Sequence, residues 1–263
     1  MAKRLKLATR GFGAEPGQPD VAALAEWIAE HRGRTADIVT YQLDRSLAPQ
    51  VSAEIGIPCA GGKFYACRVR ECLRGVHEDR ITDELSLDPG PVVEDAAGIV
   101  LQKKGAWCAL PAPHTLGLTD GYYDDAGEYN DAVTAVYRTL MRSMRDTGVA
   151  GHVLIADTAT EVEVQALARR KVFFFEPHPT REDLEILLER QRQVAITGDM
   201  LGTLLDLKGE YDVSRVCLVD PDRESVQLAL SHLDPDQVSA GGYCVQDCGE
   251  YWKELVSAAV YDR

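Results

Sequence analysis

The chain has 263 residues, of which 45% are hydrophobic, and it carries a formal net charge of −14. This length and hydrophobic content suffice for a globular core, in one large α/β domain or in two small ones. The excess of acids argues against non-specific binding to nucleic acid and against docking to anionic membranes, because both depend on Lys and Arg. We therefore expect a small-molecule ligand, with no nucleic-acid or membrane partner, and leave open whether the chain forms a homo-oligomer.

The N-terminal segment MAKRLKLATRGFG lacks the apolar run of a secretory signal. No segment reaches the roughly 20 apolar residues of a membrane span. These features predict a cytoplasmic protein. In a reducing compartment the seven cysteines are expected to be buried thiols, metal ligands or nucleophiles rather than disulfides.

The first 75 residues are predicted to open with a βαβ unit. Residues 4–12 form its first strand, Asp20 caps a helix with an apolar face, and residues 36–44 form the second strand. The intervening TRGFGAEPG lacks the G-x-G-x-x-G spacing of a phosphate-binding loop. Residues 64–75 are predicted as a helix whose arginines could receive an anionic substrate or offset neighbouring acids.

The next segment is expected to insert antiparallel structure. Residues 77–91 are polar and end in a D-P-G turn, which is typical of a surface loop. Residues 98–113 resemble a β-hairpin with Lys104 and Gly105 near its turn. Residues 117–131 mix five acids with three tyrosines, and we expect a mobile lid or binding loop there.

Four apolar runs in the C-terminal half determine the predicted fold. They begin at His152, Lys171, Gln193 and Ser214, so each starts 19 to 22 residues after the last. This is the length of one strand plus one helix, and it predicts parallel βα units. We expect a three-layer, mainly parallel Rossmann-like sheet with a hairpin insertion, divided into regions 1–148 and 149–263. A TIM barrel is the alternative, but it needs eight strands and only about six parallel ones are counted.

Ligands of such sheets bind beyond the carboxyl ends of the strands, and the polar residues predicted there form the candidate site. His is suited to proton transfer near neutral pH, so His178, held between two prolines near Glu176, is the first candidate acid or base and His114 the second. The strand-end acids, and the backbone of ITGDMLG, are expected to bind a cofactor. The predicted catalytic residues are His178, Glu176 and His114, and the predicted cofactor-binding residues are Asp157, Thr158, Thr197, Gly198, Asp199, Gly202 and Asp220.

These features predict an enzyme of small-molecule metabolism, of the transferase or lyase class, that binds an anionic, nucleotide-like or phosphorylated ligand. Its cofactor would be a nucleotide-type molecule or Mg²⁺. Two alternatives stay open. One is a metal or iron–sulfur protein, although the cysteines lack C-x2-C pairs. The other is a non-catalytic binding or scaffold protein. The cysteines considered for the metal alternative are Cys59, Cys67, Cys72 and Cys108.

Overall fold

Parallel strands dominate the fold. The structure, a computed structural model, describes residues 4–31, 35–246 and 248–262. Apart from the short parallel pair of β5 (Arg80–Leu87) and β7 (Thr119–Asp120), eight of its strands run parallel to their neighbours. These strands are β2 (Ala8–Pro16), β3 (Cys59–Gly61), β6 (Trp107–Pro111), β8 (His152–Ile155), β9 (Val172–Phe175), β10 (Gln193–Ile196), β11 (Arg215–Val219) and β12 (Val238–Gln246).

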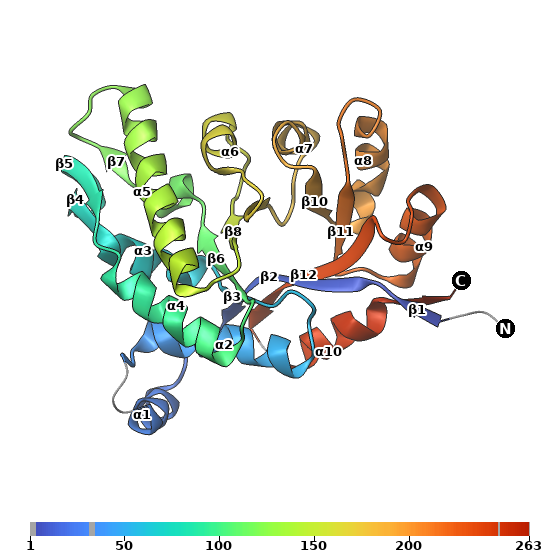
Figure 1. Ribbon diagram of the computed structural model, residues 1–263, viewed down its shortest axis with the longest axis horizontal. Helices are drawn as coiled ribbons and strands as arrows, with labels where there is room; N and C mark the ends of the chain where they lie inside the picture. Colours follow the sequence, from blue (N-terminus) through green and yellow to red (C-terminus); the bar gives the residue numbers. More distant parts are fainter. Residues whose placement is uncertain (1–3, 32–34, 247, 263) are drawn as a thin grey trace.

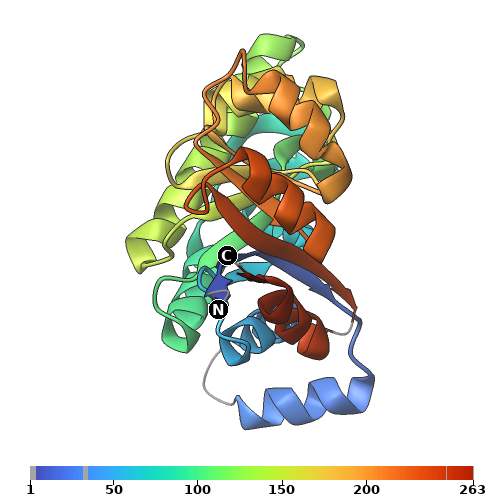
Figure 2. The same ribbon diagram turned by 90° about the vertical axis from the view of Figure 1, so that its right-hand side faces the viewer.

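The eight strands curl into a barrel (Figures 1 and 2). Ladders join them in the orders β10-β11-β12-β2 and β3-β6-β8-β9, and a bridge between Arg10 and Ile57 links β2 to the chain just before β3. Neighbours therefore follow chain order around the ring, although no ladder between β9 and β10 is recorded within the described residues. The three-layer Rossmann-like sheet is thus wrong, because such a sheet reverses its strand order at a switch point.

The interior of the barrel is a packed aromatic core. Its apolar cluster takes residues from all eight strands. The Phe12 ring stacks on those of Phe173 and Phe175, with centroids 5.4 and 4.4 Å away. The Arg10 guanidinium lies 4.3 Å from the centroid of the Trp107 ring, and a cation over an aromatic face is attracted by the ring quadrupole. Because rings fill the interior, a ligand site belongs at the strand ends.

Helices cover the outside of the barrel, and Figure 1 shows α5 to α9 following one another along it. Two further apolar clusters, formed largely between helices and strands, make up the rest of the core. No helix in the described part of the chain is long and apolar enough to cross a membrane. The helices are α1 (Val21–Glu30), α2 (Ile38–Ser52), α3 (Ala66–Cys72), α4 (Gly90–Gln102), α5 (Ala126–Thr147), α6 (Glu161–Leu167), α7 (Arg181–Leu188), α8 (Leu201–Leu207), α9 (Arg223–His232) and α10 (Cys248–Ala258), with 3-10 turns η1 (Lys63–Tyr65), η2 (Pro113–Leu116) and η3 (Gly198–Met200).

The predicted βα units of the C-terminal half are confirmed. All four apolar runs are strands, and β8 pairs with β9 and β10 with β11 in parallel. Thr180 forms a capping box with Asp183, and Asp222 forms one with Ser225. Thr160 makes no side-chain cap, and the Glu163 carboxylate bonds to His114 and does not complete a capping box.

Two predictions for the N-terminal half are wrong. Residues 36–44 lie largely in α2, because Asp37 and Thr40 form a capping box that starts a helix despite the β-branched residues after it. Residues 98–113 are the end of α4 followed by β6, so the predicted hairpin is absent there. An antiparallel hairpin is instead formed by β4 (Leu73–His77) and β5 (Arg80–Leu87), where a helix end and a polar loop were expected.

The loop predicted over the acidic, tyrosine-rich residues 117–131 is shorter in the structure. β7 (Thr119–Asp120) pairs with β5, and α5 already begins at Ala126. The backbone N–H of Leu85 donates to the Tyr123 hydroxyl, and the Tyr129 hydroxyl donates to the Leu118 carbonyl. Tyr123 therefore ties the segment to β5 and Tyr129 bonds within it, and its role as a mobile lid stays a prediction. The small sheet of β1 (Arg4–Lys6) and β13 (Val260–Asp262) joins the ends of the described chain.

Gly13 is needed where β2 packs closely inside the barrel. Its φ is +105°, and a Cβ there would lie 2.7 Å from both the Ala109 Cβ and the Gly61 carbonyl oxygen. We expect Gly13→Ala to lower the free energy of unfolding by about 2–4 kcal/mol, from backbone strain and overpacking. Gly17→Ala is the control, because nothing lies within 4 Å of its Cβ, and it should change stability by less than about 0.5 kcal/mol. Urea denaturation compares them, and equal stabilities would contradict the packing described.

Candidate functional site

The candidate site lies at the carboxyl ends of three neighbouring strands. His114 is in η2, directly after β6, Asp157 follows β8, and Glu176 follows β9 at once. Parallel strands β6, β8 and β9 are paired in this order, so their carboxyl ends meet on one rim of the barrel. Of the predicted residues, the structure thus brings together His114, Asp157, Thr158 and Glu176.

His114 is held between two carboxylates. Its Nδ1 lies 2.8 Å from Glu163 Oε2 and its Nε2 lies 2.6 Å from Asp157 Oδ1, and its backbone N–H donates to Glu163 Oε1. Partial burial lowers the pKa of His114, but the hydrogen bonds and charges of Glu163 and Asp157 outweigh this and raise the pKa above 6.5. Because ionised carboxylates only accept hydrogen bonds, the imidazole is favoured in its doubly protonated form.

Glu176 is a buried carboxyl in the same cluster. The residue is 5% exposed, and its Oε2 has no hydrogen-bond partner among the described residues. Burial, then the nearby charge of Asp183, raises the pKa of Glu176 from 4.5 to about 8. At neutral pH this carboxyl is therefore mostly protonated and can donate a proton.

Asp183 is the ionised neighbour of Glu176. Its carboxylate accepts hydrogen bonds from the Thr180 hydroxyl, from the backbone N–H groups of Ala159 and Thr180, and from the Thr158 hydroxyl at 3.0 Å. Burial raises the pKa of Asp183, but these bonds outweigh it and lower the pKa to about 2. Two adjacent carboxyls with pKa values pushed apart are typical of acid–base sites.

A second group of contacts closes another part of the barrel rim. Glu15, at the end of β2, accepts hydrogen bonds from the Tyr243 hydroxyl and from the backbone N–H groups of Lys63 and Phe64. A Cβ on Gly62 would collide with the Ala14 carbonyl and with Glu15. The adjacent glycines Gly61 and Gly62 thus allow close packing, and Glu15 joins β2, η1 and β12.

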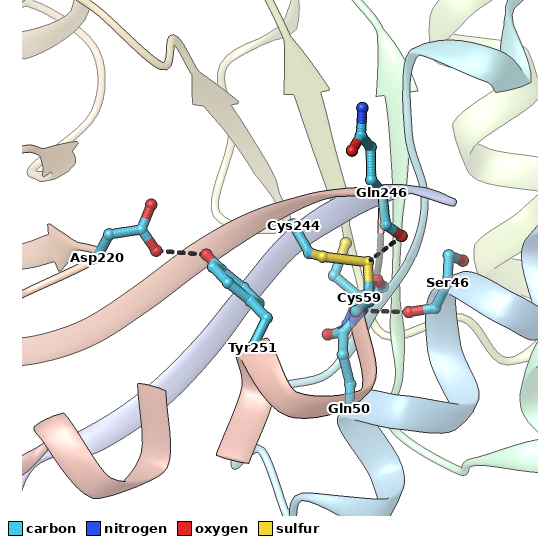
Figure 3. The surroundings of a disulfide bond; sticks show 8 residues. Ser46, Gln50, Cys59, Asp220, Cys244, Gln246 and Tyr251 are labelled. Atoms are coloured by element: carbon cyan, nitrogen blue, oxygen red, sulfur yellow. Dashed lines mark hydrogen bonds between the residues drawn. A yellow bond between two sulfur atoms is a disulfide. The ribbon is translucent and has the colours of Figure 1, made fainter. Parts of the chain in front are cut away.

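Asp220 makes its contact away from the His114 cluster. Figure 3 shows its carboxylate accepting a hydrogen bond from the Tyr251 hydroxyl of α10. Nearby, a disulfide between Cys244 and Cys248 ties the end of β12 to the start of α10. The expectation that the cysteines are free thiols is therefore wrong for these two, whose Cα atoms lie 5.7 Å apart.

The remaining predicted cofactor residues gather around the end of β10. Hydrogen bonding to Thr197, and more weakly the charge of His178, lowers the pKa of Asp199. Gly198 packs against Ser225, and nothing lies within 4 Å of a Cβ on Gly202. His178 is exposed, and no hydrogen bond or ion pair joins it to Glu176 in the part of the chain that the structure describes.

The free cysteines do not form a metal centre with their neighbours. Cys59, Cys72, Cys108 and Cys217 are buried and Cys67 is exposed. Across residues 4–31, 35–246 and 248–262, no group of three or more His, Cys, Asp and Glu side chains is placed to hold a metal ion. Burial raises the pKa of the Cys59 thiol to about 12, which disfavours the thiolate that a metal requires.

Sequence reasoning missed two residues of the cluster, Glu163 and Asp183. Both occupy the third position of a helix, and their spacing from Thr160 and Thr180 indicated only a capping role. Asp183 does cap its helix and also bonds to Thr158, whereas Glu163 turns to His114. The signal that could have identified them is that both helices begin directly beyond strands ending in acids.

Two solved structures resemble the chain over almost its full length. One is of a protein assigned as a vitamin-B12-independent methionine synthase from Listeria monocytogenes, with 13% identity and a TM-score of 0.57 over 95% of each chain. The other is a B12-independent methionine synthase from Shewanella sp. W3-18-1 in complex with selenomethionine, with 15% identity and a TM-score of 0.57 over 97% of each chain. At this identity the likeness shows a shared α/β fold alone. No family model and no curated protein matches the chain.

The raised pKa of Glu176 predicts a pH-dependent stability. Below about pH 4.5 the carboxyl is protonated in both the folded and the unfolded chain. As the pH rises towards 8 the unfolded chain ionises first, so the free energy of unfolding falls, by up to about 1.4 kcal/mol per pH unit from this group. Glu176→Gln removes this loss, so the stability of the variant relative to wild type should increase between about pH 5 and about pH 8. Urea denaturation at both pH values measures the difference, and a constant difference would contradict the raised pKa.

Proposed function

We propose that the chain is an enzyme of small-molecule metabolism that uses general acid–base catalysis at the carboxyl ends of β6, β8 and β9. The observation that carries this proposal is a buried Glu176, with its pKa raised to about 8, in the same cluster as a His114 bonded through both ring nitrogens. A group whose pKa lies near the working pH transfers protons most effectively. The fold shared with two methionine-synthase structures supports a metabolic enzyme.

Each residue of the cluster has a distinct role in this proposal. Glu176 donates a proton to the substrate, and Asp183 keeps that proton in place by remaining ionised beside it. Glu163 is a positioning residue, because it bonds both the backbone N–H and Nδ1 of His114. The Asp157 side chain is 67% exposed, so a substrate oxygen can replace it at Nε2 and accept a hydrogen bond from the imidazolium.

The cluster favours a ligand that offers hydrogen-bond donors. The sequence predicted an anionic, nucleotide-like or phosphorylated ligand. The described residues of the cluster, however, comprise four acids and one imidazole already bonded to two of them. We therefore propose a ligand with amine or hydroxyl groups. The selenomethionine in one similar structure is an amino acid, a class that meets this requirement.

A ligand screen tests the proposed class. Amino acids, amines, polyols and organic phosphates are compared for their effect on the melting temperature. A ligand at about 100 times its Kd stabilises the folded chain by about 2.7 kcal/mol, which such a screen detects. We expect amines or polyols to stabilise the wild type and to lose this effect with Asp157→Asn and Glu176→Gln. If only phosphates stabilise it, the proposed ligand class is wrong.

Turnover of a substrate found in this way distinguishes the roles of the two candidate histidines, His114 and His178. His114→Gln or Glu176→Gln should lower turnover about 10²- to 10⁴-fold, the usual effect of removing a positioned proton donor. His178→Gln is the matched control, since His178 is exposed and lies beside Asp199, and it should leave turnover unchanged. A loss with His178→Gln and none with His114→Gln would return the catalytic role to the residue that the sequence favoured.

A further inference from the structure

A cavity of about 700 Å³ lies among helices outside the barrel, away from the His114 cluster. It is formed by α1, α2 and α4, and Figure 2 shows α1 at the edge of the molecule. Its size is within the range typical of small-molecule sites. The lining residues on which the argument depends are Trp27, Asp44, Glu94, Asp95, Gly98 and Leu101.

Two lining side chains carry buried polar atoms without partners. Asp95 is 4% exposed, and its Oδ2 accepts hydrogen bonds from the Tyr65 hydroxyl and Arg68 Nε, at 2.7 and 2.8 Å. Asp95 Oδ1 and the indole Nε1 of Trp27 have no hydrogen-bond partner among the described residues. A buried donor or acceptor is costly to leave unpaired, so one unpaired acceptor and one unpaired donor on the same cavity point to a ligand that supplies both partners.

The charge of the cavity indicates the kind of ligand. The described residues of its lining include the three acids Asp44, Glu94 and Asp95, together with His31, and no Lys or Arg. Asp95 is paired with Arg68, whereas Asp44 accepts from Gln102, Glu94 accepts from Thr35, and neither of these two makes an ion pair with another described residue. The remaining wall includes apolar side chains such as Leu43 and Leu101. An ammonium group on an apolar skeleton complements such a wall.

Gly98 leaves space open in this cavity. It lies inside α4, and a Cβ built on it would meet nothing within 4 Å. Glycine within a helix is destabilising relative to alanine. Packing therefore does not require a glycine here, and a larger side chain at this position would occupy the cavity.

We propose that this cavity binds a small organic cation, namely an amine that also carries a hydroxyl or carbonyl oxygen on an apolar skeleton. The ammonium group bonds the free oxygen of Asp95 and lies near Glu94 and Asp44. The ligand oxygen accepts the hydrogen bond of the Trp27 indole N–H. The site is separate from the His114 cluster and does not depend on the function proposed for it.

Three matched probes test the charge requirement. 2-Amino-1-phenylethanol carries the ammonium, the hydroxyl and an apolar ring. In 1-phenyl-1,2-ethanediol a hydroxyl replaces the ammonium. In mandelate a carboxylate replaces the aminomethyl group. Calorimetric titration should show the amine binding at least about 10-fold more tightly than either analogue, since about 1.4 kcal/mol corresponds to a factor of ten. In NMR spectra the indole N–H signal of Trp27, assigned with Trp27→Phe, should shift on titration with the amine.

Variants of α4 locate the binding. Gly98→Phe should weaken amine binding more than about 10-fold by filling the cavity, whereas the control Gly98→Ala should change it less than about twofold. Glu94→Gln, which alters an exposed carboxylate, should weaken amine binding several-fold, and it replaces Gly98→Phe as the test if that variant does not fold. Glu176→Gln, at the barrel rim, should leave amine binding to the cavity unchanged. The proposal is overturned if the amine does not bind, if the diol binds equally well, or if Gly98→Phe or Glu94→Gln, once shown to be folded, binds like wild type.

Discussion

Carboxylates that meet at one end of a parallel barrel repel one another, and the balance of these charges governs the candidate site. Glu163, Asp157, Glu176 and Asp183 all converge at the ends of β6, β8 and β9. His114 compensates two of them through its ring nitrogens, and backbone and hydroxyl donors keep Asp183 ionised. Glu176 is buried, and the charge of His114 compensates it only in part, so it retains its proton. The repulsion among the four carboxylates thus keeps Glu176 protonated and makes it a proton donor.

The barrel supports this arrangement because its interior is filled. Phe12 of β2 stacks on Phe175 of β9, and the Phe175 ring lies tilted against Tyr243 of β12, with centroids 5.7 Å apart. Close packing of this kind fixes the directions in which the strands end. The helical cavity beside α1 is a different environment, where Asp44 and Glu94 face apolar side chains and no Lys or Arg stands among the described lining residues. The two sites therefore favour ligands by different means, proton donation at the barrel rim and charge complementarity in the cavity.

The sequence predicts the C-terminal half well because its strands are apolar runs of regular spacing followed by marked helix caps. It predicts the barrel only as the alternative to the Rossmann-like sheet, because strands such as β3, which has only the three residues Cys59–Gly61 within a glycine-rich segment, escape the strand count. The helix over Ile38–Ser52 was mistaken for a strand because β-branched and aromatic residues at its start outweighed the Asp37 cap. At the site, the strand-end position identified Glu176 and Asp157, whereas His114 was identified only as a histidine after a proline-rich turn. The pairing of His114 with Glu163 depends on two segments 49 residues apart, which local patterns cannot show.

The protonation state of Glu176 is the central claim, and carbon-13 NMR of its side-chain carboxyl measures it directly. The signal is assigned by its loss in Glu176→Gln and followed as the pH is raised through neutrality. We expect a single proton to be released with a midpoint near 8, as burial and the neighbouring Asp183 require. A midpoint close to the ordinary glutamate value of about 4.3 would show that Glu176 is ionised at neutral pH and would contradict its role as the proton donor.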